Sequence, residues 1–211
     1  MHKKPALFPQ QIYFITDQDA SGLSHVRQVE LLLAAGARLI QIRDKRCSSH
    51  DLYIASAEAV RLTRGSGTLI VVNDRVDIAL ACGADGVHLG QDDLPPATAR
   101  ELLGANAIIG ISTHNVAQAE AASSEPVDYI AIGPVFATSS KLNADPMIGL
   151  DGVNRIRQAV GNIPLVAIGG ISSTNIASVI AAGADAAAVI SSALRPPNTI
   201  VENVRTLFQS V

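Results

Sequence analysis

The chain has 211 residues and a formal net charge of −3 at pH 7; 48% of the residues are hydrophobic, 17% charged and 3% aromatic. This length suits one domain with a sizeable core, and no apolar run is long enough to cross a bilayer. Because the sequence has no basic stretch, it carries no electrostatic footprint for nucleic acid, and small molecules are the expected partners.

The N-terminus and the cysteines bear on cell compartment. The apolar stretch at residues 5–9, after Lys3 and Lys4, is too short for the core of a signal peptide, so a cytoplasmic protein is expected. Cys47 and Cys82 lie far apart, which excludes a CxxC metal site and predicts reduced thiols. The sequence leaves the oligomeric state open, a homo-oligomer included.

Eight short apolar runs, each followed by a helical pattern, predict an α/β fold of one domain, a (β/α)8 TIM barrel over residues 1–211. A short N-terminal extension is expected at about residues 1–10. Strands are expected at residues 11–15, 38–42, 69–72, 85–88, 107–111, 128–132, 164–168 and 186–190. Helices are expected at residues 24–36, 49–64, 75–82, 96–104, 115–123, 150–160, 173–182 and 198–209.

Polar residues follow nearly every predicted strand. In this fold the carboxyl ends of all eight strands converge on one active site, so the pattern also predicts where the chemistry lies. The connection from Gly133 to Gly149 is longer than a βα turn needs and is therefore a candidate substrate loop.

The first cluster is Gln41-Ile42-Arg43-Asp44-Lys45, after the second strand. The strand period of two places Gln41, Arg43 and Lys45 on one face and points Ile42 toward the helices. An inward Arg and Lys need anionic partners, which favours an anionic substrate. The alternative is a solvent-exposed rim, or internal ion pairs with neighbouring carboxylates.

The second cluster combines Asn73-Asp74 with Asp92-Asp93, after the third and fourth strands. Carboxylates brought side by side at one rim, without clustered His or Cys, indicate Mg²⁺ held together with waters and substrate phosphates. The alternative is that Asp74 caps the helix that begins near Arg75, and that Asp92 or Asp93 caps the next helix.

Hydroxyl groups, a lysine and glycine amides follow the later strands. Such groups bind phosphate, and the loops after the seventh and eighth strands of these barrels frequently do so. Gly169-Gly170 could equally be a simple turn. His88 and His114 also lie near the mouth, and neither receives a role as a base. The phosphate-binding candidates are Ser112-Thr113, Thr138-Ser139-Ser140-Lys141, Gly169-Gly170 and Ile190-Ser191.

In order along the chain, these motifs resemble thiamine phosphate synthase. The resemblance rests on Gln41-x-Arg43-x-Lys45, Asn73-Asp74-Arg75, residues 86–93, residues 110–114, residues 133–136, Lys141 and residues 167–171. That family joins 4-amino-2-methyl-5-hydroxymethylpyrimidine diphosphate to a thiazole phosphate carboxylate with Mg²⁺, and it releases diphosphate and CO2. The resemblance therefore implies a Mg²⁺-dependent transferase of thiamine biosynthesis that acts through a pyrimidine cation.

Site roles follow from the resemblance. It implies that Asp74 and Asp93 bind Mg²⁺ and that catalysis depends on Arg43, Lys45, Ser112 and Lys141. The residues implied to hold the pyrimidine diphosphate are Gln41, Arg43, Lys45, Asn73, Ser112 and Lys141. Those implied to hold the thiazole phosphate are Thr138, Ser140, Gly170, Ile190 and Ser191.

Two other functions remain as alternatives. A thiazole tautomerase on the same barrel would use His114 for proton transfer and would need no diphosphate or metal site. A non-catalytic sensor of a phosphate ligand is the other, since a fold alone does not imply activity.

Overall fold

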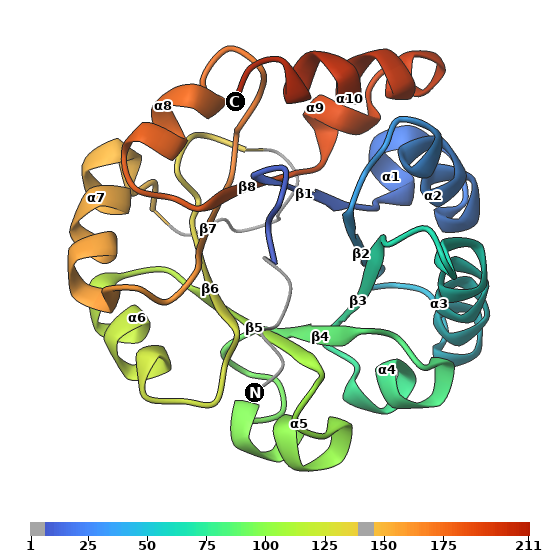
Figure 1. Cartoon of the computed structure of the whole chain (residues 1–211), viewed down its shortest axis with the longest axis horizontal. Helices are drawn as coiled ribbons and strands as arrows, with labels where there is room; N and C mark the ends of the chain where they lie inside the picture. The colour runs from blue at the N-terminus through green and yellow to red at the C-terminus, as the bar shows by residue number, and fades with distance from the viewer. Residues whose placement is uncertain (1–6, 139–145) are drawn as a thin grey trace.

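The computed structural model describes residues 7–138 and 146–211, and it forms a closed barrel of eight parallel strands in chain order (Figure 1). All eight predicted strands are present, which confirms the barrel. The strands are β1 (Ile12–Ile15), β2 (Leu39–Ile42), β3 (Leu69–Asn73), β4 (Gly86–Leu89), β5 (Ile108–Thr113), β6 (Tyr129–Ile132), β7 (Leu165–Ile168) and β8 (Ala186–Val189).

Helices cover the outside of the barrel, and each predicted helix is present. They are α2 (His25–Ala34), α3 (Ser49–Thr63), α4 (Val76–Cys82), α5 (Pro96–Leu103), α6 (Val116–Ser123), α7 (Gly149–Val160), α8 (Ile176–Ala181) and α10 (Ile200–Phe208). The sequence did not predict α1 (Gln18–Ser21), α9 (Ser191–Leu194) or the 3₁₀ helix η1 (Pro197–Thr199). Elements of three or four residues are too short to show a hydrophobic period.

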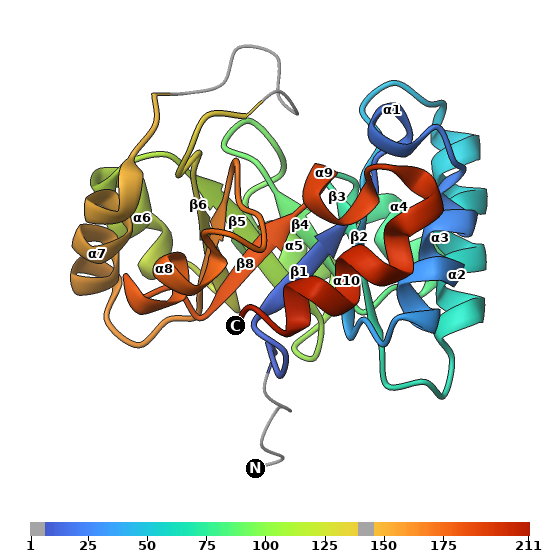
Figure 2. The ribbon, with the colours of Figure 1, turned by 90° about the horizontal axis from the view of Figure 1, so that it is seen from above.

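The two short helices lie against each other at the mouth of the barrel. α1 follows β1 and α9 follows β8, and these strands are neighbours in the sheet. Arg195, just after α9, donates from Nε to the carbonyl oxygen of Ala20 in α1 at 2.7 Å. Figure 2 shows both helices from the side. They therefore fix the rim where β1 and β8 end.

The alternation of side chains along each strand produces two apolar layers. Inside the barrel, Tyr13, Leu39, Val71 and Tyr129 pack with the inward residues of the other strands. Between barrel and helices lies a larger layer that includes Phe14, Ile40, Ile42, Val72 and Leu89. Ile42 lies on the helix side, as predicted, and Gln41 lies in the barrel interior.

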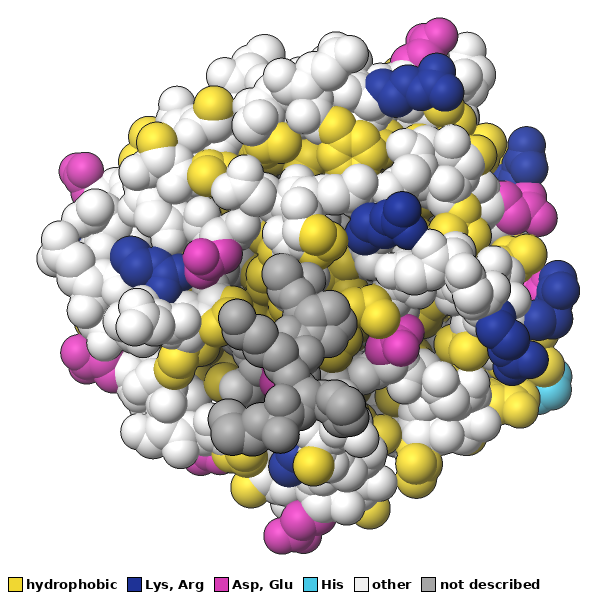
Figure 3. Space-filling view, in the orientation of Figure 1, with side chains coloured by type: hydrophobic (Ala, Val, Ile, Leu, Met, Phe, Trp, Pro, Cys, Tyr) yellow, Lys and Arg dark blue, Asp and Glu magenta, His cyan; other side chains and the backbone are white. Residues whose placement is uncertain are grey.

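Aspartates bridge strands at the opposite end of the barrel from the mouth. Immediately before β4, β6 and β8, the carboxylates of Asp85, Asp128 and Asp185 accept hydrogen bonds from strand amides of β3, β5 and β7 at 2.7–2.9 Å. Arg100 and Arg157 form ion pairs with Asp128 and Asp185. On the molecular face seen in Figure 3, basic and acidic side chains are interspersed.

No helix within residues 7–138 and 146–211 is both long and apolar enough to cross a membrane. Cys47 and Cys82 are free thiols, as predicted.

Candidate active site

The charged residues predicted after β2 meet carboxylates from two neighbouring loops. Lys45 Nζ lies 3.5 Å from Asp74 Oδ2, and Arg43 Nη1 lies 3.4 Å from Asp17 Oδ2. β2 ends at Ile42, so the strand period that placed Arg43 and Lys45 on one face does not reach them, and loop contacts orient them instead. Charge-assisted hydrogen bonds are normally about 2.7–2.9 Å long, so these longer contacts leave both cations able to bind an anion.

Asp74 and Asp93 do not cap helices, so the capping alternative is wrong for both. The N-caps of α4 and α5 are Arg75 and Pro95, and neither helix has a side-chain cap. Asp93 Oδ2 instead accepts a hydrogen bond of 2.6 Å from Gly90 N and closes its own turn.

Asp74 combines an unusual backbone conformation with a perturbed carboxyl group. Its φ of 62° lies in the left-handed region, which Asp and Asn tolerate better than most residues. Burial raises the pKa of Asp74, a hydrogen bond to the Asp93 carboxyl raises it further, and Lys45 opposes this rise. The two predicted metal ligands are therefore close enough to affect each other's protonation.

This pair of carboxylates suits a cation that takes further ligands from elsewhere. Within the described part of the chain, no group of three or more His, Cys, Asp or Glu side chains could hold a metal ion. Two carboxylates with waters and substrate phosphates are nevertheless the usual ligand set of Mg²⁺. Burial is the main cause of the raised pKa of Asp74, and the Asp93 charge adds to it; a divalent cation would offset both effects, so the residues fit this ion.

Gln41, His88 and Ser112 lie on the inner surface of the barrel. Gln41 donates from Nε2 to the Tyr13 hydroxyl at 2.9 Å, and His88 Nε2 lies 2.9 Å from Ser112 Oγ. Burial lowers the pKa of His88 to about 4, while Asp93 raises it and the Lys45 and Arg43 charges lower it. His88 is thus a neutral ring at pH 7. Asn73, at the end of β3, is the strand partner of His88.

A buried histidine that the sequence did not single out anchors the loop after β2. His25 Nε2 lies 3.2 Å from Asp44 Oδ2, and His25 Nδ1 lies 2.8 Å from Thr16 Oγ1. Asp44 Oδ1 also accepts from the amides of Arg46 and Cys47 at 2.8 and 3.0 Å. Burial alone would raise the pKa of Asp44, but the hydrogen bonds from Arg46, His25 and Cys47 outweigh it and lower the pKa. These contacts fix the loop that carries Arg43 and Lys45.

On the other side of the mouth, the loops after β6 and β7 pack together. Val135 N donates to Ile168 O at 2.9 Å, and Phe136 N donates to Gly169 O at 3.0 Å. Gly170 has φ 65°, and a Cβ there would lie 2.5 Å from the carbonyl oxygen of Ala137. Gly170 is therefore required by close backbone packing against Ala137, the residue that precedes Thr138.

Of the remaining residues predicted to bind phosphate, the structure describes some and leaves others outside its described ranges. Ser191 is the first residue of α9, and Ile190 is its N-cap. Ser140 and Lys141 lie outside the described residues. His114 Nδ1 lies 2.8 Å from Gly133 O, so this ring nitrogen carries a proton and donates to the carbonyl.

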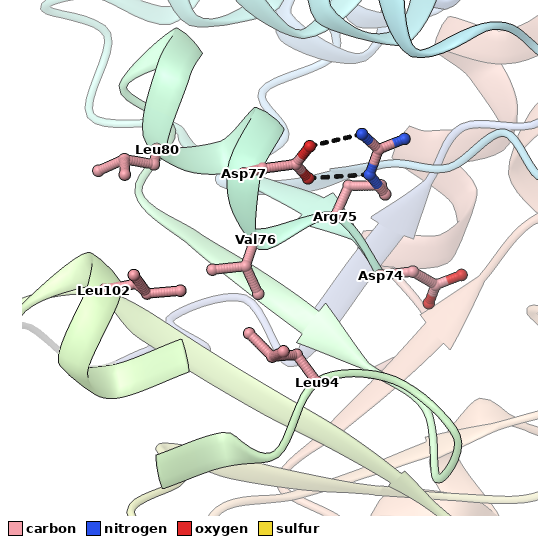
Figure 4. Close-up of a pocket in the computed structure, with 7 residues that line it drawn as sticks. All are labelled: Asp74, Arg75, Val76, Asp77, Leu80, Leu94 and Leu102. Atoms are coloured by element: carbon pink, nitrogen blue, oxygen red, sulfur yellow. Dashed lines mark hydrogen bonds and ion pairs between the residues drawn. The ribbon is translucent and has the colours of Figure 1, made fainter. Parts of the chain in front are cut away.

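An apolar groove of about 410 Å³ lies outside the mouth, between α4 and α5. Figure 4 shows Val76, Leu94 and Leu102 converging on it, whereas the Asp74 carboxylate points away; Leu80 also lines the groove. Asp74 therefore lines the groove but directs its carboxylate out of it.

Comparison with known proteins gives one consistent result. The family model described as thiamine monophosphate synthase matches residues 12–193. A thiamine-phosphate synthase from Methanoregula boonei is 48% identical over 95% of this chain and 92% of its own length. One from Chloroflexus aurantiacus is 47% identical, over 86% of this chain and 83% of its own.

A solved structure agrees with these sequence relatives. Thiamine phosphate pyrophosphorylase from Pyrococcus furiosus superposes with a TM-score of 0.86 at 35% identity, covering 97% of each chain. The match spans the barrel and the charged loops around its mouth, and the chain belongs to the thiamine phosphate synthase family of transferases.

Proposed function

We propose that this enzyme joins 4-amino-2-methyl-5-hydroxymethylpyrimidine diphosphate to a thiazole phosphate, including its carboxylated form, with Mg²⁺ bound at Asp74 and Asp93. The observation that carries the proposal is the meeting of Lys45 with Asp74 beside Asp93. Cations next to paired carboxylates provide what a metal-bound diphosphate needs: ligands for the metal and donors for the phosphate oxygens.

In the proposed reaction, the bond between the pyrimidine methylene carbon and the diphosphate oxygen breaks, and its electron pair leaves with diphosphate. The lone pair of the thiazole ring nitrogen then forms the new C–N bond with the methylene cation. Arg43 and Lys45, with Lys141, stabilise the negative charge that develops on the leaving group. Mg²⁺ held by Asp74 and Asp93 would supply further positive charge to stabilise the leaving diphosphate. With the carboxylated thiazole, CO2 is lost and its bonding electrons stay in the ring.

The residues divide between the two substrates. Gln41, Asn73 and Ser112 hold the pyrimidine diphosphate together with the three cationic side chains. Thr138, Ser140, Gly170, Ile190 and Ser191 hold the thiazole phosphate. Bond formation needs no general base because the ring nitrogen is the nucleophile, and a buried neutral His88 is compatible with that.

The tautomerase alternative has less support. It would not need the charges of Arg43, Lys45, Asp74 and Asp93 to meet at one rim, and it would use His114 to move a proton. One nitrogen of His114 already donates to the Gly133 carbonyl.

Calorimetric titration with the pyrimidine diphosphate, with and without Mg²⁺, tests the metal assignment. Asp93→Asn keeps an acceptor for Gly90 N but removes the charge, so Mg²⁺ should no longer strengthen binding. Asp92→Asn, the neighbouring exposed carboxylate, is the matched control and should keep the Mg²⁺ effect. Equal Mg²⁺ dependence in both variants would refute the assignment.

A further inference from the structure

The side chain of Asn175, at the start of α8, does not cap that helix. An asparagine at the N-cap normally accepts a hydrogen bond from an amide of the first helical turn, and Asn175 makes no such bond. Its Oδ1 instead accepts from the amide of Ser172 at 2.9 Å, and its Nδ2 donates to the carbonyl oxygen of Gly170 at 3.0 Å. The side chain is therefore directed back to the loop after β7 and away from its own helix.

Asn115 shows the ordinary arrangement in the same barrel. It is the N-cap residue of α6, and its Oδ1 accepts from the amide of Gln118 at 2.9 Å. A side-chain cap of this kind stabilises a helix, and α8 forgoes it. The two asparagines thus have the same place at a helix start but different hydrogen-bond partners.

Two hydrogen bonds hold the backbone on either side of Gly170. The carbonyl oxygen of Gly169 accepts from Phe136 N at 3.0 Å, and the carbonyl oxygen of Gly170 accepts from Asn175. Because a trans peptide unit is planar, with its C=O and N–H groups opposed, a hydrogen bond to the carbonyl also fixes the direction of the next N–H group. Phe136 therefore orients the Gly170 amide, and Asn175 orients the Ile171 amide.

The glycines make these hydrogen bonds necessary. Gly169 and Gly170 have φ 105° and 65°, and glycine leaves such a conformation easily because it has access to so many others. Among the residues that the structure describes, the amides of Gly170 and Ile171 have no acceptor. Successive N–H groups in a turn of this kind can bind an anion. The loop thus offers two amides to a ligand, and it depends on Asn175 for the direction of one of them.

We propose that Asn175 is a positioning residue for the thiazole phosphate, acting through the backbone of Gly170 and Ile171 and not through contact with the ligand. By holding the Gly170 carbonyl, it keeps the two neighbouring amides turned toward the phosphate. The inference rests on the proposed function, which assigns Gly170 to this substrate. The order of the loop in the free protein does not depend on the substrate, so the two claims can be tested separately.

The first test is backbone ¹⁵N relaxation in the free protein. Asn175→Ser keeps a good N-cap residue, but its side chain is too short to reach the Gly170 carbonyl. The order parameters of Gly170 and Ile171 should fall from about 0.85, the value of rigid backbone, to below about 0.6, with little change in melting temperature. Asn175→Asp, which keeps the acceptor for Ser172 but loses the donor for Gly170, should show the same loss of order.

Asn115→Ala is the matched control for this measurement. It removes a true cap, so it should lower the melting temperature and leave the order parameters of Gly170 and Ile171 unchanged. Unchanged order parameters in both Asn175 variants would overturn the proposal whatever the substrate of the enzyme.

The second test compares calorimetric titrations with the thiazole phosphate and with inorganic diphosphate plus Mg²⁺. Asn175→Ser should weaken the thiazole phosphate about 10-fold, as expected for one compromised hydrogen bond, and should leave inorganic diphosphate unchanged. Asn115→Ala should change neither. Equal weakening of both ligands, or no weakening of the thiazole phosphate, would overturn the positioning role. If the wild-type protein did not bind the thiazole phosphate at all, the proposed function would fail instead.

Discussion

The Lys45 ammonium lies 3.5 Å from the Asp74 carboxylate, so the loops after β2 and β3 bring opposite charges together at the mouth of the barrel. Lys45 is 58% exposed on its side chain, so this pair contributes little to the stability of the fold. The pair matters instead for ligand binding at the mouth of the barrel. A cation and a carboxylate pair within reach of one ligand can hold a diphosphate and its metal together.

Removal of the Asp74 charge should change both the stability and the activity of the protein. Asp74→Asn should raise the melting temperature of the metal-free protein at pH 7 by a few degrees, since it removes repulsion with Asp93 and Asn tolerates the left-handed backbone. Mg²⁺ should raise the melting temperature of the wild type but not of the variant, and Mg²⁺-dependent turnover should be lost. A variant that is less stable without metal yet still stabilised by Mg²⁺ would contradict this.

The His25–Asp44 contact should matter for one substrate only. His25→Ala removes the side chain that ties Asp44 and its loop to α2, so the pyrimidine diphosphate should bind about 10-fold more weakly, in proportion to one lost charge-assisted contact. Binding of the thiazole phosphate should not change. His50→Ala, on the exposed surface of α3, serves as the control in the same titrations. Equal losses for the two substrates would show that His25 supports the whole fold rather than this loop.

Gly170 allows close packing to be separated from backbone strain. Gly170→Ala adds a Cβ within 2.5 Å of the Ala137 carbonyl, and it should lower both the melting temperature and the affinity for the thiazole phosphate. Gly83→Ala is the matched control: its φ of 67° imposes similar strain, of about 1–2 kcal/mol, but nothing lies within 4 Å of the added Cβ. If the two variants lost equal stability and bound the thiazole phosphate equally well, the loop after β7 would not depend on this contact.

Asp85 makes the stability of the fold depend on pH. Burial raises its pKa in the folded protein, so the folded state binds this proton more tightly than the unfolded chain. Stability from this group is present below the unfolded pKa, about 3.9, and is lost as pH rises toward the raised folded value. Asp85→Asn should therefore gain unfolding free energy relative to wild type as the pH rises from 3 to 7, measured by urea unfolding.

Asp185→Asn is the contrasting variant, because Asp185 has an arginine partner, Arg157. Loss of the Asp185 charge, and with it the ion pair to Arg157, should destabilise the protein at pH 7. A difference between Asp85→Asn and wild type that does not change with pH would contradict the assigned pKa direction.

The strands were predictable because each is a short apolar run followed by a helical pattern, and this unit of strand and helix occurs eight times along the chain. The polar strand ends followed from the same pattern, since parallel strands present their carboxyl ends to one side. The orientation of Arg43 and Lys45 did not follow, because β2 ends at Ile42 and the loop is set by His25, which is distant in sequence.

The hydrogen bond between Tyr13 and Tyr129 inside the barrel could not be predicted from the sequence either. Tyr13 and Tyr129 look like ordinary apolar strand residues, and only the closing of the barrel brings β1 and β6 across from one another. Gly110 offered a signal, because a glycine inside a strand often marks the close approach of another group. In the structure that group is the Tyr129 ring, whose Cζ would lie 2.0 Å from a Cβ at Gly110.

The most direct test of the central claim is to incubate the wild-type protein with the pyrimidine diphosphate, the thiazole phosphate carboxylate and Mg²⁺, and to follow the products by chromatography. We expect thiamine phosphate and diphosphate in equal amounts, and no product when Mg²⁺ is chelated. Isomerisation of the thiazole alone, unaffected by chelation and with the pyrimidine diphosphate left intact, would contradict it.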